Sequence, residues 1–573
     1  MMAMSASVVW NAGQNQVLNT AESMVVVGGP GSGKTAVLQE KARRAQAAGH
    51  TVQLLTFGAR VAEFLKSDKP TYAVSTMVEA AAAQLVAHGV PVKSATNNQM
   101  RQLLRQLMPA QSFQGTLAEA EHIVRAAKSR AKKLPENDRY FPFVKAYQQQ
   151  LESQGLLDRH DIIRRHVLAM RENAVPPLKV TWLLVDTVQD ITELQLIWLQ
   201  QHMAHGVKVV LAVDDDTTAY GRDGAMGHGV LASLEAMGVP QVVLPQGYRM
   251  PTTLAPVYGR MARQLRQRAP KPEATASTRQ GAVVVEMFAE RRAEQGYVVE
   301  RCRALAARGE TVGVITRTDA EANHMVHVLQ KQGLNPASYA RLVWEEPTPQ
   351  LVLAVLYMLV GQARAAHVQL VVLGLGVPWA ALPEASTLEN WLEKGAPWPL
   401  AAGSSPTTQM LQARIRQAFR GAYMLWSGQH MPPRDIFKAL VADVLPLLPV
   451  PEQESALLAA DMLVGLGGKL AEVLPRIQHE TMPDMASLVT VAPVREVRGR
   501  AFRHVVMPFM GASSWPLKEG PLLPAEPDHE RRLWLLACSR AEETLMLTGH
   551  EPTQSPFVAE LQQALAMVAR KGA

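Results

Sequence analysis

The stretch Met24-Val-Val-Val-Gly28-Gly-Pro-Gly-Ser-Gly33-Lys34-Thr35 decides the fold. An apolar run, a glycine-rich turn and the Ala-, Leu-, Lys- and Arg-rich segment Ala36–Ala47 predict a strand, a tight loop and a helix. The turn fits G-x-x-x-x-G-K-[ST], in which backbone N–H groups and the helix N-terminus surround phosphates, and the Lys-Thr pair disfavours a purely structural turn. We predict a phosphate site formed by Gly28, Gly29, Pro30, Gly31, Ser32, Gly33, Lys34 and Thr35, with Thr35 also a ligand of Mg²⁺.

Short β-branched runs separated by helical patterns predict parallel sheets, and therefore an α/β protein. Runs at 52–57, 182–186, 207–213 and 239–244 belong to a first domain (1–76 and 171–265), which a helical insertion (77–170) interrupts. Runs at 282–287, 311–316, 488–491, 504–508 and 545–548 predict a second domain (282–343 and 485–550) with a mostly helical insertion (344–484). The polar, proline-containing stretch 266–281 is the predicted linker, and 551–573 a helical C-terminal tail.

Composition excludes several classes of protein. A chain of 573 residues has room for several domains, and its two cysteines, Cys302 and Cys538, are too few for a disulfide scaffold. No apolar stretch reaches the ~20 residues of a membrane span, and the first residues lack the basic and apolar segments of a signal peptide. We expect a cytoplasmic protein without a membrane partner. The net charge of +7 favours a polyanionic partner only mildly.

A second motif follows the run that ends in Leu183-Leu-Val-Asp186. A carboxylate at this strand end faces the phosphate loop, where it can bind Mg²⁺. The sequence continues as Asp186-Thr-Val-Gln189-Asp190, which resembles the Asp-Glu-x-Gln-Asp pattern of the UvrD/Rep family of superfamily 1 helicases.

The resemblance extends along most of the chain in the order of the family's motifs. The matching segments are Trp10-Asn-Ala-Gly-Gln14, Thr56-Phe57, Thr76, 147–168, Asp214-Asp-Asp-Thr-Thr-Ala-Tyr220-Gly-Arg-Asp-Gly224-Ala225, Gln246-Gly-Tyr248-Arg249, Val314-Ile-Thr-Arg317 and Glu530-Arg-Arg-Leu-Trp-Leu-Leu-Ala-Cys-Ser-Arg540-Ala541.

The resemblance implies two RecA-like P-loop domains with ATP and Mg²⁺ between them. Gln14 would bind the adenine, Asp186 would hold Mg²⁺, and Lys34, Asp186 and Gln189 would serve catalysis together with two arginine fingers, Arg249 and Arg540. It also implies translocation from 3′ to 5′ on single-stranded DNA, with partly duplex DNA as a further substrate. The implied nucleic-acid residues are Phe57, Thr76, Tyr220 and Tyr248.

Departures from the family pattern fall on catalysis and coupling. Thr187 stands where the family has the glutamate base, and a neutral hydroxyl cannot take a proton near pH 7. Asp190, Asp214 and Asp215 are the candidate substitutes. The other departures are Thr217 for Gln, Arg222 for an aromatic residue, Asp223 for Arg, and the segment Val489–Phe502, where Ala492 and Ala501 replace His and Glu.

Two functions therefore stay open: an ATP-dependent DNA helicase or translocase, and an ATP-binding regulatory or structural subunit with weak or no hydrolysis. A small-molecule kinase explains none of the later motifs. The basic run 125–133 is either a phosphate-tracking surface or a solvated helix face. The insertion 344–484 is a candidate surface for a protein partner.

Overall fold

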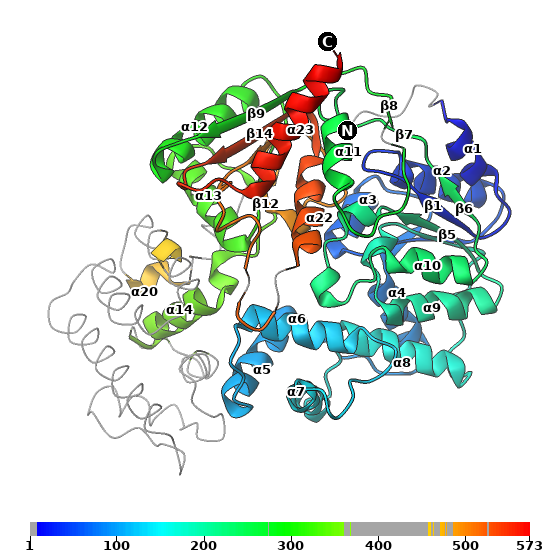
Figure 1. The fold of residues 1–573 in the computed structure, drawn as a ribbon. Helices are drawn as coiled ribbons and strands as arrows, with labels where there is room; N and C mark the ends of the chain where they lie inside the picture. Colours follow the sequence, from blue (N-terminus) through cyan, green and yellow to red (C-terminus); the bar gives the residue numbers. More distant parts are fainter. Residues whose placement is uncertain are drawn as a thin grey trace, which may run out of the picture.

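The computed structural model describes residues 9–272, 274–359, 485–518, 520–523 and 526–572, together with a few positions between 362 and 477. Two six-stranded sheets, both entirely parallel, organise this part of the chain (Figure 1). The predicted α/β class is confirmed. Most of the predicted insertion 344–484 lies outside the described residues; there the structure gives α14 (Pro347–Leu359) and α20 (Leu470–Val473).

The first sheet has the order β3-β2-β4-β5-β1-β6. Its strands are β3 (Ala73–Thr76), β2 (Val52–Thr56), β4 (Trp182–Val185), β5 (Lys208–Val213), β1 (Met24–Val27) and β6 (Gln241–Val243). Successive side chains of a strand point to opposite faces. One face packs on α1 (Ala12–Asn19), α2 (Lys34–Ala47) and α3 (Ala59–Ser67). The other packs on α4 (Met77–Ala87), α8 (Arg159–Arg171), α9 (Glu193–Ala204) and α10 (Gly229–Ala236).

The first insertion is helical, and three of its helices share a small core of their own. They are α5 (Asn97–Ala110), α6 (Leu117–Lys128) and α7 (Phe141–Ser153), which bury Leu104, Val124 and Tyr147 among others. The other two helices of the insertion, α4 and α8, pack against each other, and α8 also packs against α9; together they attach the insertion to the first sheet.

The second sheet has the order β11-β12-β10-β13-β14-β9. Its strands are β11 (Ala337–Ser338), β12 (Val489–Pro493), β10 (Val312–Thr316), β13 (Phe502–Met507), β14 (Ala541–Gly549) and β9 (Ala282–Met287). One face packs on α12 (Arg291–Ala306) and α13 (Asp319–Lys331). The other packs on α11 (Ala255–Ala262), α22 (Pro527–Cys538) and α23 (Pro556–Gly572), which stand together in Figure 1.

Two features differ from the sequence-based expectation. Helix α11, assigned from sequence to the first domain, buries Val257, Tyr258 and Met261 in the core of the second sheet. The predicted linker 266–281 is not a solvated tether, because β8 (Ala274–Thr275) pairs with β7 (Gln246–Gly247) and Lys271 is buried. Apolar burial and ion pairing, which composition does not reveal, hold both segments in place.

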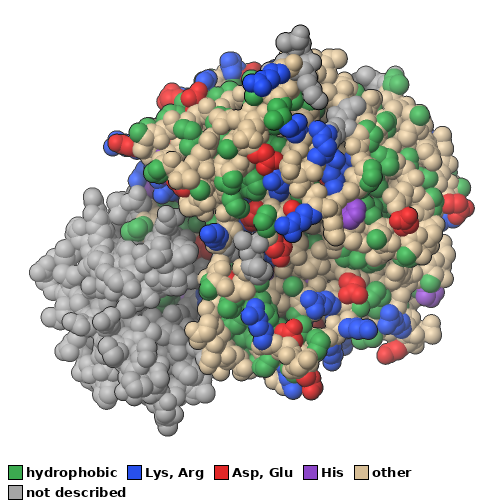
Figure 2. Space-filling view, viewed as in Figure 1, with side chains coloured by type: hydrophobic (Ala, Val, Ile, Leu, Met, Phe, Trp, Pro, Cys, Tyr) green, Lys and Arg blue, Asp and Glu red, His purple; other side chains and the backbone are tan. Residues whose placement is uncertain are grey.

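Among the residues that the structure describes, no helix is both long enough and apolar enough to cross a bilayer. On the face shown in Figure 2, basic and acidic side chains are interspersed. The excess positive charge of the chain is therefore not gathered into one patch on that face.

Candidate nucleotide-binding site

The glycine-rich loop turns sharply between β1 and α2. Gly31 and Gly33 have φ angles of +73° and +84°, which L side chains rarely adopt. A Cβ at Gly31 would lie 2.5 Å from the Cβ of Arg249, and one at Gly33 would lie 2.7 Å from Nε2 of Gln14. Both glycines are thus required by backbone conformation and by close contacts on either side of the loop.

The Lys34 ammonium group is folded back into this loop. Its Nζ donates to the carbonyl oxygens of Gly28 and Gly29, each at 2.7 Å, and lies 3.8 Å from a carboxylate oxygen of Asp214. Burial lowers the pKa of Lys34. A bound phosphate would therefore compete with two carbonyl groups and one carboxylate for this cation.

Oxygen ligands suited to Mg²⁺ meet beside Lys34. The hydroxyl of Thr35, in the first turn of α2, donates to Oδ2 of Asp186 at 2.6 Å. Asp186 directly follows β4, and its Oδ1 accepts from the backbone N–H of Thr187 at 2.9 Å. A hydroxyl and a carboxylate at a phosphate loop fit Mg²⁺, which takes few protein ligands and completes its shell with phosphate and water oxygens.

Gln14 and Tyr248 lie on the other side of the loop. The Gln14 amide donates to the carbonyl of Ser32 at 3.2 Å and accepts from the N–H of Asn11 at 3.0 Å, as part of the α1 capping box. The Tyr248 N–H donates to Gly31 O at 2.8 Å, and the Asn11 side chain donates to the Tyr248 hydroxyl at 2.8 Å. We expected Tyr248 among the nucleic-acid residues, but the structure groups it with Gln14 at the phosphate loop.

Arg249 and Arg540 approach the loop from different segments. Arg249 Nη1 lies 3.4 Å from the carbonyl oxygen of Ser539, and the buried Arg540 donates to the Ser539 hydroxyl at 2.8 Å. Burial lowers the pKa of both guanidinium groups, and their mutual repulsion lowers that of Arg540 further. Within the described residues, neither arginine forms an ion pair with a carboxylate. Two neighbouring cations without a carboxylate, one buried and one half-buried, favour a polyanion beside them.

Position 187 offers no base. The Thr187 hydroxyl donates to the carbonyl of Asp186 at 2.7 Å, and its backbone is left-handed, with φ of +57°. Left-handed backbone is unusual for a β-branched residue and marks local strain.

The three candidate substitutes for the base have different surroundings. Asp190 pairs with Arg498 and accepts from the N–H of Ala219 at 2.9 Å. Asp215 contacts Lys271 at 2.5 Å. Only Asp214 pairs with Lys34, and its N–H donates to Gln189 Oε1 at 3.0 Å. Gln189 therefore holds in place the one candidate carboxylate that faces the loop.

The remaining predicted nucleic-acid residues lie at the carboxyl ends of first-sheet strands. The rings of Phe57 and Tyr220 contact each other, with centroids 4.8 Å apart, and the Arg498 guanidinium lies 5.9 Å from the Tyr220 ring. Thr76 is buried and caps α4 by accepting from the N–H of Glu79 at 3.1 Å. A pocket of about 430 Å³ lies beside Phe57 and Tyr220. A nucleobase stacking on either ring would have to enter where the two rings and Arg498 already pack.

Two of the five basic side chains of the run 125–133 are paired inside the protein. Arg125 lies 3.5 Å from Asp223, and Lys128 contacts Asp158 at 2.6 Å and Asp161 at 2.8 Å. Burial alone would raise the pKa of Asp223, but Arg125 and His122 hold it well below its usual value. These internal pairs leave less positive charge for a phosphate backbone than the sequence suggests.

Two predicted motifs of the second half pair with each other. Arg317 donates to both carboxylate oxygens of Glu530, at 2.6 and 2.9 Å. Sequence reasoning missed two contacts of this region, those of Lys271 and of Arg498. Arg498 stands next to Gly499 where the family pattern has Lys-Gly, so a cation was recognisable there. No pattern pointed to Lys271.

Comparison with known proteins bears on the first half of the chain. Residues 13–222 match the family model AAA_19, described as an AAA domain. Among curated proteins, none matches the chain. The matched range contains the phosphate loop, Asp186, Gln189 and the segment from Asp214 to Arg222. The first half of the chain is thus similar to an AAA-type P-loop domain of the superfamily 1 helicase type.

Proposed function

We propose that the protein is an ATP-dependent helicase or translocase of the UvrD/Rep type, which binds ATP and Mg²⁺ between its two α/β halves and moves 3′ to 5′ on single-stranded DNA. The observation that carries the nucleotide site is a pair of arginines, the buried Arg540 and the half-buried Arg249, which lack carboxylate partners in the described part of the chain and adjoin an intact phosphate loop. The AAA-domain match supports a helicase-like nucleotide hydrolase.

Each residue of the site has a task in this proposal. Lys34 leaves the carbonyls of Gly28 and Gly29 to neutralise β- and γ-phosphate oxygens. Thr35 and Asp186 hold Mg²⁺, which would neutralise charge on the phosphates. Arg249 and Arg540 stabilise the charge on the γ-phosphate as arginine fingers.

Water activation falls to Asp214, because it is the carboxylate nearest to Lys34 among the three candidate substitutes. Asp190 is engaged by Arg498, and Asp215 lies closer to Lys271 than Asp214 does, at 2.5 against 3.3 Å. We propose that Gln189 positions Asp214 through the backbone N–H that it accepts. Positioned bases contribute about 10²–10⁴-fold to a rate, so a substitute in imperfect geometry predicts slow turnover.

A second function, an ATP-binding regulatory or structural subunit without unwinding, is favoured by two observations. Thr187 carries no base and its hydroxyl is bound to the carbonyl of Asp186. The Phe57 and Tyr220 rings are packed on each other rather than presented as two open stacking faces. In this second function, ATP would close the two halves, and a partner protein would bind the closed form.

Steady-state ATP hydrolysis with and without single-stranded DNA separates the two functions. A motor gives DNA-stimulated turnover that disappears in Lys34→Ala and falls at least tenfold in Asp214→Asn. If the protein binds ATP without hydrolysing it, and Thr187→Glu does not restore hydrolysis, the protein is the regulatory or structural subunit.

A fluorescent-nucleotide titration tests the arginines. Arg540→Ala should weaken ATP binding more than ADP binding, because its proposed contact is with the γ-phosphate. Arg503→Ala is the matched control, since Arg503 is half-exposed and pairs with Glu543 at 2.7 Å on the second half. Equal losses for ATP and ADP would contradict the role assigned to Arg540.

A further inference from the structure

We propose that Lys271 makes the segment joining the two halves responsive to nucleotide, through a carboxylate that it shares with Lys34. The segment 266–281 is called the strap here. The proposal rests on nucleotide binding at the phosphate loop, as proposed above, and adds a route by which occupancy of that loop reaches the connection between the halves.

The strap is held against the first half at several points. Its β8 pairs with β7, and the Ala276 N–H donates to Gly247 O at 2.7 Å. The Thr275 hydroxyl donates to Met250 O at 3.1 Å. The Ala269 N–H donates to Oδ2 of Asp215 at 2.7 Å. The strap therefore has an ordered position beside the phosphate loop, which a change in the loop can alter.

Lys271 occupies the centre of an acidic cluster. Its Nζ lies 3.3 Å from Asp214, 2.5 Å from Asp215 and 2.9 Å from Asp216, and its side chain is only 1% exposed. The three carboxylates can bring oxygens within 4.8 Å of one another, as metal ligands do. Although burial by itself would lower it, the carboxylates raise the pKa of Lys271 above its ordinary value. The ammonium group thus sits where a cation bound by these three residues would sit.

Asp214 is shared between the strap and the phosphate loop. One of its carboxylate oxygens lies 3.3 Å from Lys271, and the other lies 3.8 Å from Lys34. Arg268, also in the strap, donates to Asp216 at 2.9 Å. Three carboxylates therefore face three lysine and arginine side chains, two from the strap and one from the loop, and the His228 ring also contacts Asp215 at 2.8 Å.

Nucleotide binding would change this balance. When Lys34 turns to the phosphates, the cluster keeps three carboxylates but only the two strap cations, Lys271 and Arg268. The electrostatic attraction between the carboxylates and the strap then rises, because the three carboxylates interact with two cations instead of three. Conversely, without Lys271 the Asp214 carboxylate interacts with Lys34 alone. The stronger Asp214–Lys34 attraction then opposes the movement of Lys34 to the phosphate.

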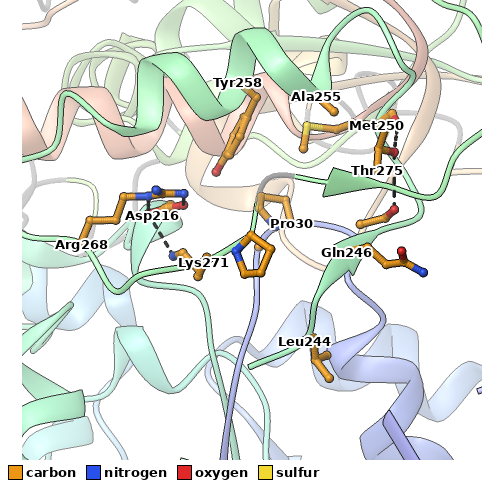
Figure 3. A pocket seen from close by; sticks show the side chains of 13 residues that line it. Pro30, Asp216, Leu244, Gln246, Met250, Ala255, Tyr258, Arg268, Lys271 and Thr275 are labelled. Atoms are coloured by element: carbon orange, nitrogen blue, oxygen red, sulfur yellow. Dashed lines mark hydrogen bonds and ion pairs between the residues drawn. The ribbon is translucent and has the colours of Figure 1, made fainter. Parts of the chain in front are cut away.

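A small pocket lies between part of the strap and the loop. It is lined by Pro30 of the loop, Lys271 and Thr275 of the strap, and Tyr258 of α11 (Figure 3). The Tyr258 hydroxyl is buried, faces this pocket and has no hydrogen-bond partner within the described residues.

Hydrogen exchange and nucleotide titration on the full chain test the proposal. In the wild type, ADP or a slowly hydrolysed ATP analogue should slow exchange of the strap amides of Ala269 and Ala276 at least threefold. Lys271→Met should abolish this response and weaken nucleotide binding roughly tenfold, which corresponds to about 1.4 kcal/mol. Lys271→Arg keeps the cation and should retain most of both effects.

A double-mutant cycle identifies the shared carboxylate. In an Asp214→Asn background, Lys271→Met should change nucleotide affinity less than twofold, because the link to Lys34 is already gone. Asp214→Asn alone should also remove the exchange response, so the test does not depend on the folding of Lys271→Met.

The outcomes distinguish the role proposed for Lys271 from the proposed nucleotide binding at the phosphate loop. Nucleotide binding that Lys34→Ala removes, without any change in strap exchange, overturns the role of Lys271 and leaves the nucleotide site intact. Equal effects of Lys271→Met in both backgrounds overturn the role of Asp214. A wild type that binds no nucleotide overturns both proposals.

Discussion

Arg498→Met should weaken the contact between the two halves and destabilise the protein. The loss of stability should depend on pH. Arg498 is 8% exposed, pairs with the fully buried carboxylate of Asp190 and donates to the carbonyl of Thr217. It belongs to the second half, whereas both partners belong to the first. Breaking a buried pair by removing one partner typically costs about 3–5 kcal/mol, because the remaining charge is left uncompensated.

The pH dependence follows from the partner that remains. Burial already raises the pKa of Asp190, and loss of the guanidinium raises it further. The folded variant therefore binds a proton more readily than the unfolded chain, and one unit of pKa corresponds to about 1.4 kcal/mol. Protonation relieves the buried charge, so the destabilisation is greatest at pH 8 and smaller at pH 5.5.

Thermal unfolding of wild type, Arg498→Met, Asp190→Asn and the double variant at both pH values measures this effect. A loss of 3 kcal/mol in a domain of this size lowers the melting temperature by roughly 6–12 °C. The double variant should recover most of the loss at pH 8, since neither charge remains. An equal loss at the two pH values, or a double variant no more stable than Arg498→Met, would refute this account of the pair.

Three further predictions concern other sites. Thr187→Asn should stabilise the fold by about 1 kcal/mol, because Asn tolerates left-handed backbone, whereas Thr187→Val keeps the branched Cβ and should bring no gain in melting temperature. Burial holds the pKa of His166 and His202 at about 4, below the ~6.5 of an unfolded chain, so the unfolded state takes up protons first. Stability should be full above pH 6.5 and fall as the pH drops toward 4, by about 2 kcal/mol per ring at pH 5, in melting curves at constant salt. Glu119→Ala should speed exchange of the Leu522 and Leu523 amides, which donate to Glu119 at 2.6 and 2.9 Å, at least tenfold, whereas Glu119→Gln keeps an acceptor and should change it less.

Local sequence patterns were enough to predict the helices and strands around the phosphate loop. The run from Met24 to Val27 forms β1, and α2 ends at Ala47 as predicted but begins at Lys34, two residues before the predicted segment. The strand predicted at 282–287 has the bounds of β9. Such elements are predictable because consecutive residues carry the signal: apolar β-branched runs, glycine at left-handed positions and a helix start after them.

The sequence analysis did not predict several short strands. β3, β7, β8 and β11 contain two to four residues each, too few to show a period. Their pairing with neighbouring strands, rather than their own composition, makes them strands. The assignment of α11 failed for a related reason, since an amphipathic helix does not reveal which of two sheets will cover it.

The sequence by itself determined the class of the fold, the order of its two halves and the phosphate loop with Lys34, Thr35 and Asp186. Only the tertiary structure decided that Tyr248 contacts Asn11, which also bonds Gln14, that Asp214 rather than Asp190 or Asp215 meets Lys34, and that Lys271 enters the acidic cluster. The physical reason is range: backbone preferences and hydrophobic periods act between neighbours in the chain. A buried ion pair, by contrast, depends on which distant residues packing brings within a few ångströms, in a medium where each charge must find its partner.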